Sequence, residues 1–210
     1  ISLGLVGSEM CIRDSTGTRL DPQQIIALAA SAPQTLVVVD ELYEAFTGDS
    51  VLPCADFSAT PNVLVLRSLA KTAGLAGLRI GFAIGHADVV DRVSRVTGPY
   101  DVNSVAVAAA FAALADQSYV DAYVAEVLRA RALTLEGLKA AGLRHHCDGG
   151  NYLLIWPKRP PLEVEADLRA AGILVRSMAG KPLINGSLRV SLGTSSQMQR
   201  FLEAFLAIDP

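Results

Sequence analysis

The sequence predicts an α/β fold. Short continuous apolar runs alternate with glycine- and proline-containing loops and with helical segments. This pattern is typical of strands in a sheet that helices cover on both faces. The composition, with 51% hydrophobic and 19% charged residues, is that of a folded globular protein. A chain of 210 residues can form one substantial core and a smaller second domain.

In the first half we expect a helix and three strands. Asp21 and Pro22 have the residue types of an N-cap and of a first helical position, and the apolar residues after them predict a short amphipathic helix that ends near Pro33. The predicted strands are the β-branched and apolar runs at 36–39, 63–66 and 80–84. Because these runs are apolar on both faces, they predict central strands of a covered sheet.

The second half predicts a small α+β domain. Residues 104–143 are alanine-rich and helical in pattern, and they predict two helices or one long bent helix. The expected elements that follow are strand 152–156, helix 163–171 closed by Gly172, strand 173–176, alternating strand 187–192 and a helix at about 196–207. Helices and antiparallel strands in this order favour an α+β arrangement.

Charge and hydropathy exclude several kinds of partner. Eighteen basic and 21 acidic residues leave a formal charge of −3, and no run of like charge offers a footprint for nucleic acid or for an anionic membrane. The longest apolar run, 105–115, is far shorter than the ~20 residues of a membrane-spanning helix. Cys11, Cys54 and Cys147 are an odd set without close pairing, which predicts reduced cytoplasmic thiols and no thiolate metal site.

Three residues of the second half draw attention without predicting a site. His145 and His146 are adjacent, so their side chains do not share a face as metal ligands usually do, and we expect them in a loop. Trp156 is expected in the core of the small domain. We therefore predict no bound metal.

The first fifteen residues differ from the rest. They begin without Met, have no basic region before their short apolar stretch and lack the small-residue cleavage pattern of a signal peptide. We interpret residues 1–15 as a foreign segment joined to a genuine reading frame at about Ser15.

A carboxylate follows the first predicted strand. Asp40 stands at the carboxyl end of that strand, where open α/β sheets place their ligand crevice. Tyr43 comes three residues later, with a phenol that can reach the same crevice. Alternatively, Asp40 caps the loop and Tyr43 packs beside the sheet. The two residues alone leave both interpretations open.

The segment from Arg67 to Gly81 holds the strongest candidates. Desolvation in a turn between two buried strands disfavours the charged form of an amine, so Lys71 is a candidate nucleophile. Ser68 and Arg79 can hold a phosphate from two sides. The glycine spacing is GxxGxxxG, which lacks the dinucleotide fingerprint GxGxxG and disfavours a Rossmann dehydrogenase. The alternative is a glycine-rich connection with a solvated lysine.

Together these segments resemble fold-type I aminotransferases, and most closely the histidinol-phosphate aminotransferases. The matching segments are Asp40-Glu41-Leu42-Tyr43, Ser68 through Gly81, Pro99 through Ser104, Gly150-Asn151-Tyr152 and Leu188 through Thr194. The resemblance runs from Thr16 to the C-terminus. It implies part of the large domain of a pyridoxal-phosphate-dependent transferase at 16–115, with a mainly parallel sheet between helices, and a small α+β domain at 116–210.

The resemblance implies a role for each candidate near the cofactor. Lys71 would hold pyridoxal 5'-phosphate as a Schiff base and carry the proton between the substrate and the cofactor. Asp40 would pair with the pyridinium nitrogen, and Tyr43 would donate to the ring phenolate oxygen. Ser68 and Arg79 would bind the cofactor phosphate.

Two arginines of the second half are implied in substrate binding. Leu188, Val190 and Leu192 face one way on the alternating strand, which sends Arg189 to the other face. By resemblance Arg189 would bind the substrate α-carboxylate, and Arg176 is a candidate for the substrate's own phosphate. Without the resemblance, each is more simply a solvated strand residue.

The implied activity moves an amino group between histidinol phosphate, or a similar amino compound, and 2-oxoglutarate in histidine biosynthesis, with a homodimeric parent enzyme. A decarboxylase that resembles threonine-phosphate decarboxylase is one alternative, and an inactive truncated remnant is another. Cys11 to Ser15 stand where the family has an asparagine that contacts the cofactor, and Ala70 replaces a frequent hydroxyl residue. We therefore expect this form to bind cofactor weakly and to turn over little.

Overall fold

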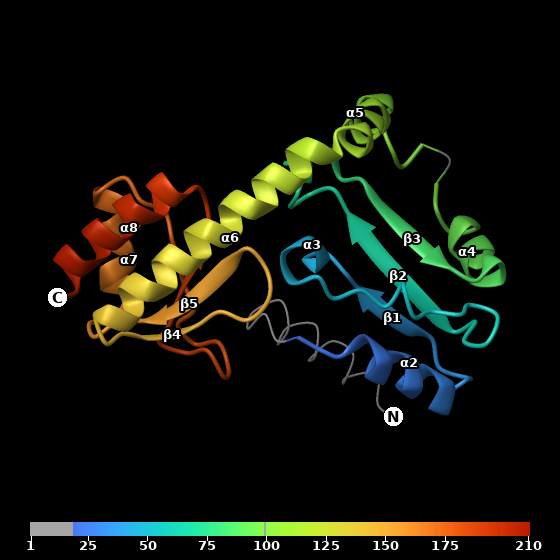
Figure 1. Cartoon of the computed structure of the whole chain (residues 1–210), viewed down its shortest axis with the longest axis horizontal. Coiled ribbons are helices and arrows are strands. Elements are labelled where there is room, and N and C mark those ends of the chain that lie inside the picture. Colours follow the sequence, from blue (N-terminus) through green and yellow to red (C-terminus); the bar gives the residue numbers. More distant parts are fainter. Residues whose placement is uncertain (1–18, 99) are drawn as a thin grey trace. The chain divides into compact units, whose positions relative to one another are not determined.

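The structure is a computed structural model that describes residues 19–98 and 100–210 (Figure 1). These residues form two compact units, an N-terminal unit of residues 20–123 and a C-terminal unit of residues 124–210, to which Arg19 also belongs. The segment interpreted as foreign, 1–15, lies outside the described residues, and so does Cys11. The α/β class is confirmed, and the expected division between residues 115 and 116 stays a prediction.

The N-terminal unit begins with helix α2 (Pro22–Ser31). The Asp21 carboxylate accepts hydrogen bonds from the backbone amides of Gln23 and Gln24, at 2.7 and 3.4 Å, and Pro22 lacks the amide hydrogen that would have no helical partner there. The predicted cap is confirmed. At the far end of the helix, the Asn62 side-chain amide donates to three backbone carbonyls, those of Ala29, Ala32 and Thr35.

Three strands form the sheet of this unit, in the order β1 (Val37–Asp40), β2 (Val63–Ser68) and β3 (Gly81–Gly85) (Figure 1). Strands β1 and β2 are parallel, and β2 and β3 are antiparallel. The buried residues Val39, Val63 and Val65 pack with Ala29 and Ile25 of α2. Helix α2 thus covers one face of the sheet.

The predicted burial on both faces is confirmed for β2 only. Val63, Leu64 and Val65 are all buried, although they alternate between the two faces. In β1 the side chain of Val38 is 50% exposed, and in β3 that of Phe82 is 36% exposed. In the described chain β1 therefore has one open face, whereas β3 exposes residues on both faces, since the neighbours Phe82 and Ala83 are both exposed. Apolar periodicity cannot reveal this because it reports residue type and not the neighbours.

Several helices complete the N-terminal unit. The elements are α3 (Glu44–Thr47), the 3₁₀ turn η1 (Ala76–Leu78), α4 (Ala87–Ser94) and α5 (Ser104–Ala115). The Asn103 side chain caps α5 by accepting from the amide of Ala106. The alanine-rich region forms two helices, α5 and α6 (Gln117–Ala140). Asp116 lies between them as the C-cap of α5, and its carboxylate accepts a hydrogen bond from the amide of Tyr119 in the first turn of α6.

The C-terminal unit contains a second sheet and two further helices. Its strands are β4 (Arg144–His146), β5 (Tyr152–Trp156), β6 (Arg176–Ser177) and β7 (Leu188–Ser191), in the spatial order β4-β5-β7-β6 with antiparallel pairing throughout. The helices are α7 (Pro161–Ala170) and α8 (Ser195–Ile208). The predicted α+β character of this part is confirmed.

Helix α8 has a capped first turn. The Thr194 hydroxyl accepts from the Gln197 amide, and the Gln197 side chain accepts in return from the Thr194 amide, which is a capping box. The Glu126 carboxylate, from α6, accepts from the Ser195 amide at 2.7 Å. Three backbone donors at this helix end, the amides of Thr194, Ser195 and Gln197, therefore have side-chain acceptors.

Two expectations for this unit are wrong. Residues 173–175 do not form a strand, because α7 closes on Gly172, whose φ of +76° is left-handed, and the Ile173 amide turns back to the carbonyl of Leu168. His145 and His146 lie in strand β4 and not in a loop. This edge strand has no apolar alternation and gave no strand pattern. The two imidazoles lie on opposite faces, as their adjacency predicts.

No helix within 19–98 or 100–210 is long and apolar enough to cross a membrane. Over the same residues, no group of three or more His, Cys, Asp or Glu side chains is placed to hold a metal ion.

Candidate functional site

The carboxyl edge of strands β1 and β2 carries most of the candidate residues. Because these strands are parallel and Asp40 pairs in register with Leu66, their carboxyl ends meet at one edge of the sheet. Asp40 ends β1 and Ser68 ends β2, and the loops that follow carry Tyr43 and Lys71. Two segments 28 residues apart (Asp40 to Ser68, Tyr43 to Lys71) thus meet there, because they follow neighbouring strands.

Asp40 is exposed, and one of its carboxylate oxygens caps the following loop. Oδ1 accepts a hydrogen bond from the backbone amide of Leu42 at 3.0 Å. No hydrogen bond to Oδ2 occurs among the residues that the structure describes. The loop-cap interpretation therefore holds for Oδ1. Oδ2 can accept a hydrogen bond from a ligand.

Lys71 and Tyr43 lie together. The ammonium nitrogen is 5.8 Å from the centre of the phenol ring, within the range of a cation–π contact. Both side chains are partly buried. The amine is therefore held against an aromatic face next to the strand end that carries Asp40.

Ser68 already makes two hydrogen bonds inside its own loop. Its hydroxyl donates to the carbonyl of Ile80 at 3.2 Å and accepts from the amide of Ala70 at 3.1 Å. Arg79 is exposed and has a left-handed φ of 55°, a conformation that costs energy for a residue with a side chain. Ser68, at the carboxyl end of β2, pairs in register with Gly81. Arg79 comes two residues before Gly81 and therefore lies near that end of β2.

An ion-pair network beside this edge was not predicted. Glu41 is 8% exposed, and its carboxylate accepts from the amide of Val51 and from the hydroxyl of Ser50. Arg67 binds the same carboxylate through Nε at 2.9 Å and reaches Glu44 at 3.1 Å. The network joins the loop after β1 to the end of β2. Sequence gave no signal for it, since neither residue belongs to a periodic pattern.

The C-terminal unit carries the two candidate arginines. Arg176 and Arg189 are opposite each other in the β6–β7 pairing. Leu188 and Val190 are buried while Arg189 is on the other face, which confirms the predicted alternation. The Arg189 guanidinium lies 3.9 Å from the centre of the Tyr152 ring, whereas Arg176 is exposed. Tyr152 belongs to the matching segment Gly150-Asn151-Tyr152 but had no predicted role.

The candidate residues of the N-terminal unit and those of the C-terminal unit differ in chemistry. The sheet edge of the N-terminal unit offers an amine, a phenol, a hydroxyl and a carboxylate oxygen that accepts no hydrogen bond from the described residues. This set can bind a planar ligand with a carbonyl and a protonated ring nitrogen. The C-terminal unit offers two guanidinium groups, which suit carboxylates and phosphates.

Comparison with known proteins gives related sequences and folds. A histidinol-phosphate aminotransferase of Pasteurella multocida is 37% identical over 193 residues, which are 90% of this chain and 52% of that protein. The structure of histidinol-phosphate aminotransferase from Sinorhizobium meliloti, in complex with pyridoxal-5'-phosphate, superposes with a TM-score of 0.79 at 23% identity, over 92% of this chain and 54% of that one. L-threonine-O-3-phosphate decarboxylase from Porphyromonas gingivalis also has a TM-score of 0.79, at 24% identity, over 91% of this chain and 60% of that one.

The two structural matches, both under 25% identical, establish the fold alone. The chain spans about half the length of the curated relatives that it matches. Residues 10–205 match the family described as aminotransferase class I and II. The match extends over most of the chain, and the chain therefore belongs to the aminotransferase class I and II family.

Proposed function

We propose that this chain is part of a pyridoxal-phosphate-dependent aminotransferase in which Lys71 holds the cofactor. The contact between Lys71 and Tyr43, at the strand end that carries Asp40, supports the proposal most directly. Family membership gives independent support. The donor set also fits the cofactor, whose aldehyde, ring nitrogen, phenolate oxygen and phosphate need an amine, a carboxylate, a phenol and a hydroxyl or guanidinium partner.

The cofactor would be held by residues of the N-terminal unit. The Asp40 oxygen without a partner would accept from the protonated ring nitrogen, and the Tyr43 phenol would donate to the ring oxygen. Ser68 would bind the phosphate only by giving up its bond to the Ile80 carbonyl, which at 3.2 Å is the longer of its two hydrogen bonds. Arg79 would supply charge to the same phosphate.

Lys71 would serve two purposes. Its amine would anchor the cofactor and, when the substrate has replaced it there, would remove and return the proton at the substrate α-carbon. The bound cofactor supplies an acceptor for the electrons that this proton leaves behind. Asp40 would keep the ring nitrogen protonated, because its negative charge favours the cationic form.

Arg189 would bind the substrate α-carboxylate, and Arg176 a second anionic group such as a phosphate. The β6–β7 pairing and the aromatic face of Tyr152 support this assignment, because they hold Arg189 in a defined direction next to Arg176. From the names of its relatives we propose histidinol phosphate as amino donor. From the resemblance of the sequence we further propose 2-oxoglutarate as acceptor, a role in histidine biosynthesis and a cytoplasmic homodimer.

Trapping with borohydride tests the assignment of Lys71. The purified chain is incubated with pyridoxal 5'-phosphate, reduced, digested and examined by mass spectrometry. The lysines of the chain are Lys71, Lys139, Lys158 and Lys181. We expect labelling at Lys71 at cofactor concentrations that leave the other lysines unlabelled, and its loss in Lys71→Ala. Equal labelling of all four lysines would contradict the proposal.

Product analysis tests the reaction. With histidinol phosphate and 2-oxoglutarate, an aminotransferase forms glutamate in an amount equal to the donor consumed. Release of carbon dioxide from a phosphorylated amino acid, without consumption of the oxo acid, would identify a decarboxylase instead. If Lys71 is labelled specifically and neither product forms, the chain binds the cofactor without turnover, as expected for an inactive form.

A further inference from the structure

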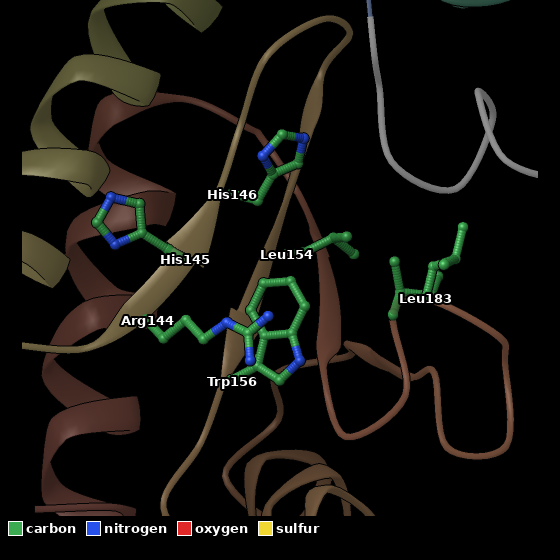
Figure 2. Close-up of a pocket in the computed structure, with 7 residues that line it drawn as sticks. Arg144, His145, His146, Leu154, Trp156 and Leu183 are labelled. Atoms are coloured by element: carbon green, nitrogen blue, oxygen red, sulfur yellow. The ribbon is translucent and has the colours of Figure 1, made fainter.

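A pocket on the sheet of the C-terminal unit has no part in the proposed reaction. It has a volume of about 330 Å³, within the range of small-molecule sites. Its lining residues are Arg144, His145, His146, Leu154, Trp156, Leu183 and Ile184. Figure 2 shows that Arg144, His146 and Trp156 project on one side of the sheet, whereas the ring of His145 points away from them.

The strand register explains this arrangement. Arg144 pairs with Trp156, and His146 pairs with Leu154, so all four side chains lie on the same face of β4 and β5. Leu154 is in turn opposite Arg189 on β7. Leu154 therefore separates His146 from the candidate α-carboxylate site, and the pocket is a distinct place on this face.

Two polar groups of the pocket make no hydrogen bond with the described residues. His146 Nε2 is inaccessible to solvent and makes no hydrogen bond within the described residues, which is costly for a buried imidazole nitrogen. The Arg144 guanidinium stacks on the Trp156 ring at 4.2 Å, and no carboxylate or carbonyl accepts a hydrogen bond from it in the described part of the chain. The stacked plane leaves the edge of the guanidinium open to an anion.

The apolar wall is held in place by a strained turn. Leu183 has a left-handed φ of 67°, and the amide of Ile184 bonds back to the carbonyl of Pro182, which makes a γ-turn of the rare, strained kind. The Leu183 side chain is 73% exposed at the pocket, while Ile184 is buried against Leu154. The Trp156 indole is fixed from the same loop, because its N–H donates to the carbonyl of Asn185.

We infer that this pocket binds a small aromatic ligand with one anionic group, a carboxylate or a phosphate. The ring would lie between the Leu183 side chain and the wall of Leu154 and Ile184. The anion would be bound by the Arg144 guanidinium at the edge that the stack leaves open. His146 Nε2, which has no accessible surface in this structure, would donate to the same group once the imidazole ring turns toward the pocket. The site needs only residues of the C-terminal unit, so it is independent of Lys71 and of the cofactor.

The chain carries its own probe of the site, because Trp156 is the single tryptophan. Phenyl phosphate and phenylacetate are titrated into the full chain, without pyridoxal phosphate, while tryptophan fluorescence is recorded. We expect a saturable change with both ligands. Inorganic phosphate, which has the charge without the ring, and benzyl alcohol, which has the ring without the charge, should bind at least about tenfold more weakly. No saturable change with either aromatic anion overturns the proposal.

Variants locate the binding. Arg144→Ala removes an exposed side chain and should weaken binding about tenfold or more, whereas Arg169→Ala, an exposed arginine of α7, should not. Leu183→Gly should relieve the turn, raising the melting temperature while weakening binding. If Arg189→Ala abolishes the signal and Arg144→Ala leaves it unchanged, the ligand binds at Arg189 and the proposal is wrong.

Discussion

The ammonium nitrogen of Lys71 lies 5.8 Å from the centre of the Tyr43 ring. The two residues belong to different loops, and each loop follows one strand of the parallel pair β1 and β2. The aromatic face therefore holds the amine at the edge where Asp40 ends its strand.

Tyr43→Phe tests the hydroxyl group of Tyr43 separately from its aromatic ring. The ring, and with it the contact to Lys71, is kept, but one hydrogen-bond donor is lost. We expect the pyridoxal phosphate concentration for half-maximal trapping at Lys71 to rise about two- to tenfold, as the loss of one hydrogen bond predicts. Tyr43→Ala should raise it further. Tyr119→Phe, at an exposed tyrosine of α6, is the control and should have no effect.

Arg67 should stabilise the N-terminal unit through the nearly buried Glu41 carboxylate. Arg67→Ala leaves this charge without its partner, and we expect a loss of about 2–4 kcal/mol in the free energy of opening. The loss for Arg67→Lys should be smaller than that for Arg67→Ala but not zero, because an ammonium group keeps the charge and cannot reproduce the guanidinium fork. Hydrogen exchange at the amides of Val39 and Val65 measures the change. Arg95→Ala, which breaks an exposed pair with Asp91, should cost less than about 1 kcal/mol.

Two glycines of the N-terminal unit differ in the space around them. A Cβ at Gly85 would lie 2.9 Å from the carbonyl oxygen of Val63, whereas a Cβ at Gly77 would have no atom within 4 Å. Gly85→Ala should therefore destabilise the sheet by about 1–3 kcal/mol, because a paired backbone must shift. Gly77→Ala should be neutral or slightly stabilising. Equal losses of hydrogen-exchange protection at Leu64 in both variants would contradict this explanation.

Glu126 should make the stability of the C-terminal unit depend on pH. The Ser195 amide, together with the Arg129 guanidinium, lowers the pKa of the Glu126 carboxyl from 4.5 to about 2. Because the pKa is lower in the folded state, the stabilisation is fully present above about pH 4.5 and is lost as the pH falls through about 2.

Glu126→Gln should therefore lower the melting temperature at neutral pH, and its difference from the parent chain should shrink between pH 4.5 and about 2. Trp156 fluorescence reports the melting of this unit. Glu136→Gln, at an exposed position of the same helix, is the matched control and should follow the parent at every pH. A constant difference across the whole pH range would show that the ionisation of Glu126 is not its cause.

Much of the fold follows from local signals. Asp21 and Pro22 predicted the start of α2, and the apolar run of β2 predicted a strand buried on both faces, because capping and burial leave their mark in adjacent residues. Strand β4 left no such mark. Its residues Arg144 to His146 are polar, and only the pairing with β5 makes them a strand.

The candidate site likewise has features that the sequence predicts and features that it cannot predict. Asp40 could be placed at a crevice because the carboxyl ends of strands gather at one edge of a sheet. The network of Arg67 and Glu41 could not be predicted, because it depends on how two loops meet. For Ser68, the sequence shows a hydroxyl but not that the Ile80 carbonyl and the Ala70 amide already bond to it.

The amino end of α8 comes directly after the strand that carries Arg189, a place where many proteins bind an anion through helix amides. Here Thr194, Gln197 and Glu126 already accept hydrogen bonds from three amides of that end. Attraction of a negatively charged molecule to this region is therefore left to guanidinium side chains. Selectivity for such molecules can then change by single substitutions during evolution, with no change in the course of the main chain.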